Sequence, residues 1–373
     1  MNHQQPEHST TWILDGFITA ESPLVTTLPA LKSSRKGNLP SPLPRISIYT
    51  ESGLEETIYF PGSGIRGKLR RCARDLVRAM VMEESGNPTP FSIMTHYYLT
   101  LGGIKDSEPE RRQDVTRVET LRSENPLISL FGASTPWLSS KLMVGHAIPS
   151  YPLSQPSVIR GVRSNDFGRN PNQIKYLPPE DVDLMLEEAL LNQQRSRLKQ
   201  ELVSIEKSIK KRDSGIEQNR DQEPSDSENR EPPLEDRVEQ IHQEIEEINE
   251  KSQFTVSIGL PLAGYEAIPQ NTQLAQRIVL RNVTHIELSL FLQTLDQFAL
   301  DPIIGSHAST GNGIISAQWE VRQQRPKTPA QSDGQIRLIP YEGIQISSPT
   351  LKQHYGNFSS TKGYNFSSPK DIP

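Results

Sequence analysis

Residues 60–71, which read FPGSGIRGKLRR, constrain the fold of this chain more than any other segment. A β-like run, ETIYF, leads into them and Pro61 ends that strand, while Gly62 and Gly64 permit a tight turn with exposed backbone. Ser63 can cap the helix that follows. The segment therefore predicts a strand, a glycine turn and a helix over residues 62–82.

The predicted helix has one apolar face and one basic face. Its apolar residues recur at helical spacing: Ile65, Leu69, Cys72, Ala73, Leu76, Val77 and Met80. Its basic residues include four arginines at successive i, i+4 positions with two more cations beside them: Arg66, Arg70, Arg74, Arg78, Lys68 and Arg71. Like charges at this spacing destabilise a helix by a few tenths of a kcal/mol per pair. An anion lying along the helix would remove that cost.

Three interpretations of this segment compete. The first is a solvated amphipathic helix. The second is a nucleotide-binding loop, because Gly62, Gly67 and Lys68 fit most of the G-x-x-x-x-G-K-[ST] pattern, although Leu69 replaces the hydroxyl that would hold magnesium. The third is a cradle for a nucleic-acid backbone, in which exposed amides at the helix start add a second attraction for phosphate.

The charge of the chain is unevenly distributed. Residues 180–252 carry 21 acidic and 11 basic side chains, whereas the rest of the chain carries 24 acidic and 29 basic ones. A mildly basic body suits a polyanionic partner. The hydrophobic fraction of 34% and the mean hydropathy of -0.56 indicate that part of the chain lies outside any core.

The acidic segment carries two heptad patterns. Apolar residues step by three, four or seven positions in two runs: Leu184, Leu191, Leu198, Leu202, Ile205 and Ile209, then Leu234, Val238, Ile241, Ile245 and Ile248. The charged stretch between the runs has almost no apolar residue, so we expect it to be disordered. The pattern predicts an antiparallel helical hairpin that projects from the body.

Other segments predict short strands and long connections. Strands are expected at residues 12–20, 46–49, 56–60, 141–148, 254–260 and 314–321, and residues 284–299 are interpreted as a strand running into a short helix. Residues 21–44 form a long Pro/Ser/Lys-rich loop. The last fifty residues are rich in Pro, Ser and Gln, which predicts a loosely ordered tail.

The motif at residues 60–71 resembles the P-G-S-S-[IL]-[KR]-G-x-[LM]-R signature of CRISPR backbone proteins, with Gly64 in place of the second serine. Further segments resemble that family in the expected order: WILDGFITAESPL resembles its first strand, LFGA its L-F-G-[ST] element, KLMVGHA the strand after it, and GSHASTGNG its glycine-rich segment. The chain thereby resembles the repeat-associated (RAMP) superfamily, and within it most closely the type IV backbone protein.

The resemblance implies an α+β fold. It implies a ferredoxin-like (RRM-type) antiparallel palm with finger and thumb insertions, and the heptads add the helical hairpin arm. We expect a backbone domain over residues 11–179 and 253–322, a coiled-coil insertion over residues 180–252 with a disordered tip, and the tail over residues 323–373.

The resemblance also implies a non-catalytic subunit that oligomerises along a guide RNA (crRNA) in a CRISPR interference complex. Expected partners are the guide RNA, a complementary target nucleic acid paired with the guide, further copies of the chain in a helical filament, and other CRISPR subunits, including a guide-end cap and a helicase. Candidate RNA-binding residues are Lys32, Arg35, Lys36, Gly62, Ser63, Gly64, Arg66, Lys68, Arg70, Arg71, Arg160, Arg163, Phe167, Arg169, His307, Ser309 and Asn312. Phe167 could stack on a splayed base.

Catalysis is not expected. Target-cutting relatives carry an aspartate before Ser-Pro in the long loop, but Pro40 stands there and residues 22–50 contain no Asp. The alternatives are a guide-processing ribonuclease with His307 as general base, and an NTPase using the near-match to a nucleotide-binding loop. Neither a metal nor a cofactor is expected, because the one cysteine and the scattered histidines lack ligand spacing.

The localisation prediction rests on what the chain lacks. With no long apolar run and no signal-peptide pattern, we expect a cytoplasmic protein with no membrane partner. The sequence leaves open the number of copies per complex, the choice between DNA and RNA targets, the role of the arm, and which arginines face RNA rather than a neighbouring subunit.

Overall fold

The computed structural model describes residues 10–26, 40–103, 115–134, 137–160, 171–216, 234–252, 264–325 and 327–369. Contacts divide the chain into two compact units, one formed by Met1–Arg160 with Ala263–Pro373 and the other by Gly161–Leu262. No helix among the described residues is long and apolar enough to cross a membrane.

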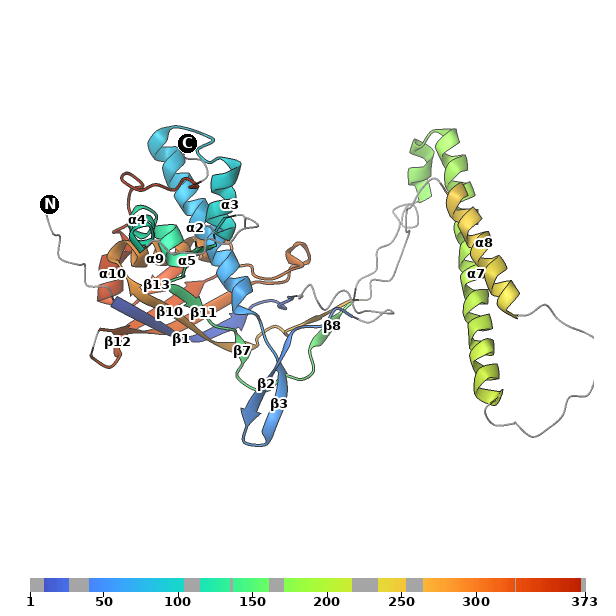
Figure 1. Cartoon of the computed structure of the whole chain (residues 1–373), viewed down its shortest axis with the longest axis horizontal. Coiled ribbons are helices and arrows are strands. Elements are labelled where there is room, and N and C mark those ends of the chain that lie inside the picture. The colour runs from blue at the N-terminus through green and yellow to red at the C-terminus, as the bar shows by residue number, and fades with distance from the viewer. Residues whose placement is uncertain are drawn as a thin grey trace, which may run out of the picture. The chain divides into compact units, whose positions relative to one another are not determined.

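The first unit is built on one antiparallel sheet (Figure 1). Its strands, in the order in which they lie side by side, are β13 (Gly343–Ile346), β12 (Gln331–Ile339), β11 (Ile315–Gln324), β1 (Thr10–Ala20), β10 (Gln273–Val283) and β6 (Leu142–Val144), with β7 (Ile148–Pro149) also paired to β10. Two long helices connect them: α2 (Gly62–Ser85) and α9 (His285–Leu300).

The topology is that of a ferredoxin-like fold. Along the chain the elements run β1, α2, β6 with β7, β10, α9 and β11, and the strands lie in the order fourth, first, third, second. Every pairing among them is antiparallel. The predicted α+β class and its RRM-type palm are confirmed by this strand order.

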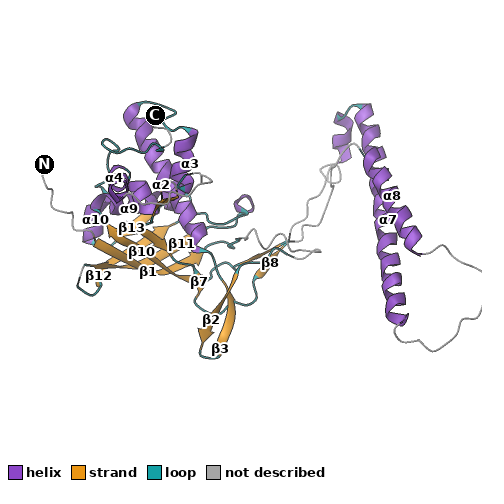
Figure 2. Cartoon of the chain, viewed as in Figure 1, coloured by secondary structure: helices purple, strands orange, loops and turns teal. Residues whose placement is uncertain are grey.

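One face of the sheet packs on helices and forms the core (Figure 2). Along β1, Trp12, Leu14, Ile18 and Ala20 are buried at alternate positions, as the predicted strand requires. Helix α2 buries Ile65, Leu69, Ala73 and Val77 and ends at Gly86, whose φ of 66° gives a left-handed C-cap. Helix α9 packs beside α2.

Shorter elements complete the first unit. They are β2 (Arg45–Thr50), β3 (Gly53–Ile58), α3 (Ile93–Leu101), α4 (Val115–Glu124), α5 (Pro126–Phe131), β4 (Ala133–Ser134), β5 (Trp137–Leu138), β8 (Ser157–Ile159), β9 (Tyr265–Ala267), the 3-10 helix η2 (Ala308–Thr310) and, after the last strand, α10 (Pro349–Tyr355). The 3-10 helix η1 (Pro171–Tyr176) belongs to the second unit. Strands β2 and β3 form a hairpin, and β8 pairs with β9.

The second unit contains an antiparallel helical hairpin, as the heptads predict. Its helices are α7 (Pro179–Ile216) and α8 (Leu234–Lys251), which pack on each other. Arg237 near the start of α8 forms an ion pair with Glu201, while Arg195, earlier in α7, donates to Asn249 near the end of α8. The predicted disordered tip lies outside the described residues.

Three predictions about the first unit are corrected. Residues 284–299 are not a strand running into a helix: Thr284 and Glu287 form a capping box that starts α9 at once. The strand expected at residues 141–148 is divided into β6 and β7 by Gly145 and His146. The described part of residues 323–373 is not a loose tail, because Ile336 and Leu338 of β12 and Leu351 of α10 are buried in the core.

The structure also contains a central strand that the sequence analysis did not predict. Strand β10 pairs with β1 along almost its whole length, from Thr19↔Gln273 to Thr10↔Val283. The strand expected at residues 254–260 lies outside the described residues.

Candidate nucleic-acid interface

The start of α2 sits very close to the edge of the sheet. Phe60 and Ala147 exchange backbone hydrogen bonds of 2.8 and 2.9 Å, and Gly62 is the first helical residue. A Cβ at Gly62 would lie 2.4 Å from the Val144 carbonyl oxygen, so only glycine permits this approach. The Gly62 N–H donates to His146 Nδ1 at 3.0 Å, which requires His146 to leave that nitrogen unprotonated.

Ser63 does not cap this helix, contrary to the prediction. The N-cap is Pro61, in an extended conformation, and it makes no side-chain capping hydrogen bond. Ser63 and Gly64 are both exposed. The first turn of α2 therefore presents a serine hydroxyl and a bare glycine to the surface.

The glycine-rich segment, residues 305–313, folds into a tight loop against the end of β1. Gly305 has a φ of 84°, and a Cβ there would lie 2.1 Å from the Val25 carbonyl oxygen. Ser306 N–H donates to that same carbonyl at 2.9 Å. Glycine is needed at this position both for the left-handed backbone and for the close approach.

The buried ring of Phe60 brings the two glycine segments together. A Cβ added at Gly64 would lie 3.3 Å from Phe60 Cε1, and one added at Gly305 would lie 3.2 Å from Phe60 Cε2. The two glycines thus lie against opposite edges of one ring, which is itself fully buried. The motif at residues 60–71 and the glycine-rich segment therefore form one contiguous surface, although they are far apart in the sequence.

Tyr265 is a member of this surface that the sequence analysis missed. The His307 ring stacks on the Tyr265 ring at a centroid distance of 4.0 Å and an interplanar angle of 16°. His307 holds a φ of 62°, and the side chains of His307 and Ser309 remain exposed. No local pattern marks Tyr265, because it follows the long insertion and reaches this place through β9.

Asn312 has a structural role rather than an exposed one. It is 4% exposed, and its side-chain amide donates to the Tyr265 hydroxyl and to Thr310 Oγ1, each at 2.9 Å. It therefore fixes the loop that carries His307. The prediction that Asn312 contacts RNA directly is not compatible with this burial.

Arg66 and Arg70 hold neighbouring helices instead of facing solvent. Arg70 is 5% exposed, and it donates to the Leu99 carbonyl at 2.6 Å and to the Tyr98 carbonyl at 3.0 Å. Arg66 donates to the Phe131 carbonyl. These carbonyls belong to the last turns of α3 and α5, where the final carbonyls of a helix have few intrahelical donors; the Tyr98 carbonyl also accepts from Gly102 N–H. The prediction that Arg70 contacts RNA is wrong for this reason, and Arg66 is half-buried with the same kind of partner.

Burial has an electrostatic consequence for both guanidinium groups. It lowers the pKa of Arg70 to about 10, with the nearby charge of Arg66 acting in the same direction. Burial also lowers the pKa of Arg66. The carbonyl dipoles at the ends of α3 and α5 compensate for the cost of holding these cations away from water.

The remaining cations of α2 divide between paired and exposed. Lys68 forms an ion pair of 2.6 Å with Asp301, and its side chain is only 17% exposed. Arg74 and Arg78 share Asp75 at 2.8 and 3.0 Å. Arg71 is exposed and has no charged partner among the described residues. The repulsion along the helix is thus relieved mostly by protein groups rather than by an external anion.

The other predicted RNA-binding residues are placed only in part. Arg160 is exposed just after β8. Six of them lie outside the described residues: Lys32, Arg35, Lys36, Arg163, Phe167 and Arg169. The described surface therefore consists of Ser63, Gly64, Arg71, His307 and Ser309, supported from beneath by Phe60, Tyr265 and Asn312.

The nucleotide-binding-loop interpretation does not fit this geometry. Helix α2 begins at Gly62, so Gly62 and Gly67 both lie inside a helix and enclose no loop that could surround phosphates. Lys68 is held by Asp301. Among the described residues no three His, Cys, Asp or Glu side chains are grouped as a metal site.

Comparisons with known proteins give distant structural similarities. No protein-family model and no curated protein matches this chain. It is similar to a solved structure described as a Type IV-B CRISPR complex, with a TM-score of 0.40 and 14% identity over 86% of this chain and 93% of that one. It is also similar to Csc2 of Thermofilum pendens, with a TM-score of 0.34 and 9% identity over 88% and 70% of the two chains. Both TM-scores are low, so the fold assignment rests on the strand order described above.

Proposed function

We propose that this chain is a non-catalytic backbone subunit of a CRISPR effector complex and that it binds a guide RNA. The observation that carries this proposal is the meeting of two glycine segments on either side of Phe60. One is the motif that resembles the CRISPR backbone signature, and the other resembles the glycine-rich segment of the same family. Two family motifs that converge on one exposed surface support a shared ligand.

The chemistry of that surface suits an RNA backbone. Bare glycines allow close approach of a ligand to the main chain, and Arg71 adds a positive charge at the exposed face of α2. The serine hydroxyls of Ser63 and Ser309 can donate to phosphate oxygens or to 2′-hydroxyl groups. Such contacts position a strand without reading its sequence, so base pairing with the guide would select the target.

A catalytic role receives no support from the residues at this surface. The His307 ring has a tyrosine ring stacked against it, and the described residues place no carboxylate in hydrogen-bond contact with its side chain. A general base needs a partner that orients it and stabilises its charge. We therefore assign His307 to stacking or backbone contact rather than to guide processing.

Repeated copies of the chain would line up along one guide. A head-to-tail interface between identical subunits extends into a helical filament when it does not close into a ring. Other CRISPR subunits, including a guide-end cap and a helicase, would bind the ends or sides of this assembly. The proposed function gives the helical hairpin no role in holding RNA.

The first test is the nucleic acid that co-purifies with the chain when it is expressed with its neighbouring genes. We expect RNAs of discrete length with repeat-derived ends. Arg71→Ala should weaken RNA retention and reduce the slope of log affinity against log salt by about 0.7, the value for one lost phosphate contact on a single strand.

A matched control is Lys352→Ala, which removes an exposed cation on α10, away from the proposed interface. It should leave the affinity and the salt slope unchanged. A nucleic-acid-free protein, or equal losses in the two variants, would contradict the proposed function.

A further inference from the structure

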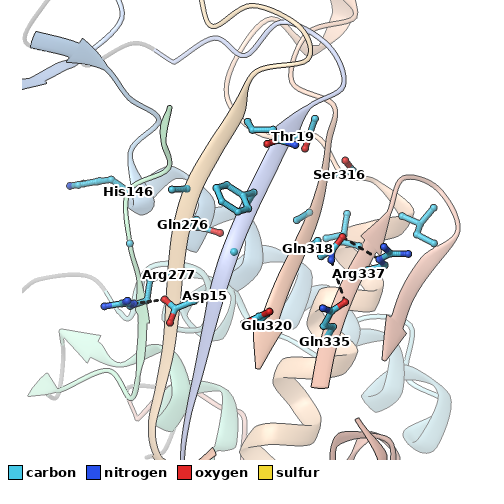
Figure 3. A pocket seen from close by; sticks show the side chains of 18 residues that line it. Asp15, Thr19, His146, Gln276, Arg277, Ser316, Gln318, Glu320, Gln335 and Arg337 are labelled. Carbon is cyan, nitrogen blue, oxygen red and sulfur yellow. Dashed lines mark hydrogen bonds and ion pairs between the residues drawn. The ribbon is translucent and has the colours of Figure 1, made fainter. Parts of the chain in front are cut away.

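Among the described residues of the first unit, no helix covers the second face of the sheet (Figure 2). Alternate residues of β1, β10 and β11 point to this face, and they line a shallow hollow of about 1060 Å³ (Figure 3). A second hollow of about 580 Å³ adjoins it along the same strands and shares Arg277 with it. The two hollows together form one surface, the open sheet face.

An aromatic ring lies at the centre of the open sheet face. Phe17 is on the central strand β1 and is 45% exposed, although its backbone is paired on both sides. Its register neighbours are Ala275 on β10 and Gln318 on β11. The alanine is too small to cover the ring, so one flank of a flat apolar surface stays open to a ligand.

The charges around this ring are predominantly positive and come from arginine. Four arginines line the two hollows, namely Arg277, Arg281, Arg322 and Arg337, against two acids, Asp15 and Glu320. Asp15 forms ion pairs with both Arg277 and Arg322, which neutralise it. Guanidinium planes stack on bases as well as pairing with phosphates.

Amide side chains beside the ring are held in fixed positions. Gln318 donates to Gln335 Oε1 at 3.2 Å and accepts from Arg337 Nε at 3.2 Å, as Figure 3 shows. This contact uses only the Nε of Arg337. The two terminal nitrogens of its guanidinium group can therefore donate to a ligand's phosphate oxygens. The open sheet face thus combines an aromatic ring with hydrogen-bonding groups of fixed geometry.

The open sheet face is continuous with the candidate nucleic-acid interface. His146 lines the larger hollow, and its Nδ1 accepts the hydrogen bond from Gly62 N–H at the start of α2. His146, between β6 and β7, therefore joins the start of α2 to the open sheet face.

We propose that the open sheet face binds an unpaired segment of a nucleic-acid strand, with one base stacked on Phe17 and its phosphates on Arg277 and Arg337. The proposal rests on the proposed function, since it extends the same RNA surface around the edge of the sheet. A second protein copy is the less suitable occupant, because the cores of protein interfaces are depleted of charge, whereas the register row Arg277, Asp15 and Glu320 crosses the middle of this face.

The experiment combines cross-linking with affinity measurements on the full chain. The RNA-bound protein is irradiated with ultraviolet light, digested, and searched by mass spectrometry for nucleotide adducts on the peptides of β1 and α2. In parallel, binding of fluorescein-labelled oligouridine and oligothymidine decamers is measured by anisotropy for Phe17→Ala, for Phe17→Leu, which keeps apolar bulk without a ring, and for Phe17→Tyr, which keeps the ring. Tyr49→Ala removes an aromatic side chain that is 85% exposed on the β2–β3 hairpin and serves as the control.

We expect an adduct on the β1 peptide and a roughly 5- to 150-fold loss of affinity in the alanine and leucine variants, the range for losing one base–aromatic stack. Phe17→Tyr and Tyr49→Ala should bind as the unchanged protein does. A stronger effect on one decamer identifies RNA or DNA as the bound strand, and either result supports the proposal.

Three results would overturn it. Adducts on α2 but not on β1, with unchanged affinities, would remove the inference and leave the proposed function standing. A change in the mass of the assembly in Phe17→Ala, with oligonucleotide affinity unchanged, would assign the open sheet face to a second copy. An absence of adducts and of co-purifying RNA would remove both proposals together.

Discussion

Arg70 provides the sharpest test of how α2 uses its arginines. Its guanidinium donates to the Leu99 and Tyr98 carbonyls at the end of α3, and only 5% of the residue is exposed. The last carbonyls of a helix lack intrahelical donors, and the helix dipole favours a cation there. Arg70 therefore anchors α3 to α2, and its replacement should act on stability rather than on ligand binding.

The magnitude follows from what Arg70→Ala removes. Each hydrogen bond to a charged group contributes about 1.5–3 kcal/mol, and two of them are lost at Arg70. The carbonyls left behind are partly satisfied, since Gly102 N–H also donates to Tyr98 at 2.9 Å, so the two losses do not add fully. We expect Arg70→Ala to lower the free energy of unfolding by about 3–5 kcal/mol, a large part of the 5–15 kcal/mol typical of a folded domain.

Urea unfolding followed by tryptophan fluorescence measures the free energy of unfolding of the first unit, which contains Arg70. Trp12 and Trp319 are buried in the sheet, and the helical hairpin contains no tryptophan, so the transition reports on the first unit. Arg71→Ala, one residue along the same helix, is the matched control and should change the free energy of unfolding by less than about 0.5 kcal/mol. If Arg70→Ala instead kept its urea midpoint and lost RNA, the assignment of Arg70 to the protein scaffold would be refuted.

Three further predictions follow from the same structure. Gly62→Ala should destabilise the first unit by about 1–3 kcal/mol in urea because its Cβ meets backbone, whereas Gly67→Ala, which meets only the end of an arginine side chain, should stabilise it by up to about 1 kcal/mol. Burial raises the pKa of Tyr98 to about 12. The stability that comes from its neutral form is therefore complete below the unfolded-state pKa of about 10 and is lost as the pH rises towards 12. Tyr98→Phe should reduce this loss of stability at alkaline pH and leave the part due to Tyr355, whose pKa is also raised to about 12. Deleting residues 180–252 should leave RNA binding and the unfolding midpoint of the first unit unchanged, and a loss of RNA in that variant would assign the helical hairpin a direct role.

The elements that could be predicted from the sequence are those in which each face has a single kind of surroundings, either the packed core or solvent. β1 alternates because one face packs on the core and the other is open, and α7 and α8 follow heptads because they pack mainly on each other. Helix α9 was misassigned because it is packed from several sides, burying Leu288, Phe291 and Leu295 with little amphipathic contrast. Its capping box at Thr284 was the readable local indication.

The prediction failed for strands β10 and β12, because their many polar residues concealed the alternation of buried and exposed positions. Strand β10 reads QLAQRIVLRNV, with Leu274, Ile278 and Leu280 turned to the core, yet its glutamines and arginines interrupt the apolar pattern, and no strand was predicted there. The C-terminal residues were predicted to be loose on the same ground, although Ile336 and Leu338 alternate within β12. Polar residues of both strands line the open sheet face, among them Arg277 in β10 and Gln335 in β12, so they are part of the strand pattern rather than an argument against it.

The candidate site shows the same limit for charge. A row of arginines on a helix is equally suited to phosphates and to the carbonyls that end a neighbouring helix, since both are oxygen acceptors with negative potential. Sequence spacing places Arg66 and Arg70 on the same face of α2 but contains no information on what packs there, and α3 and α5 fill that place. Arg71, a single residue further on, is turned away by the helical rotation and remains exposed. Tertiary packing therefore leaves Arg71 as the exposed cation that the proposed RNA ligand can reach, because the inner arginines are occupied by carbonyl groups.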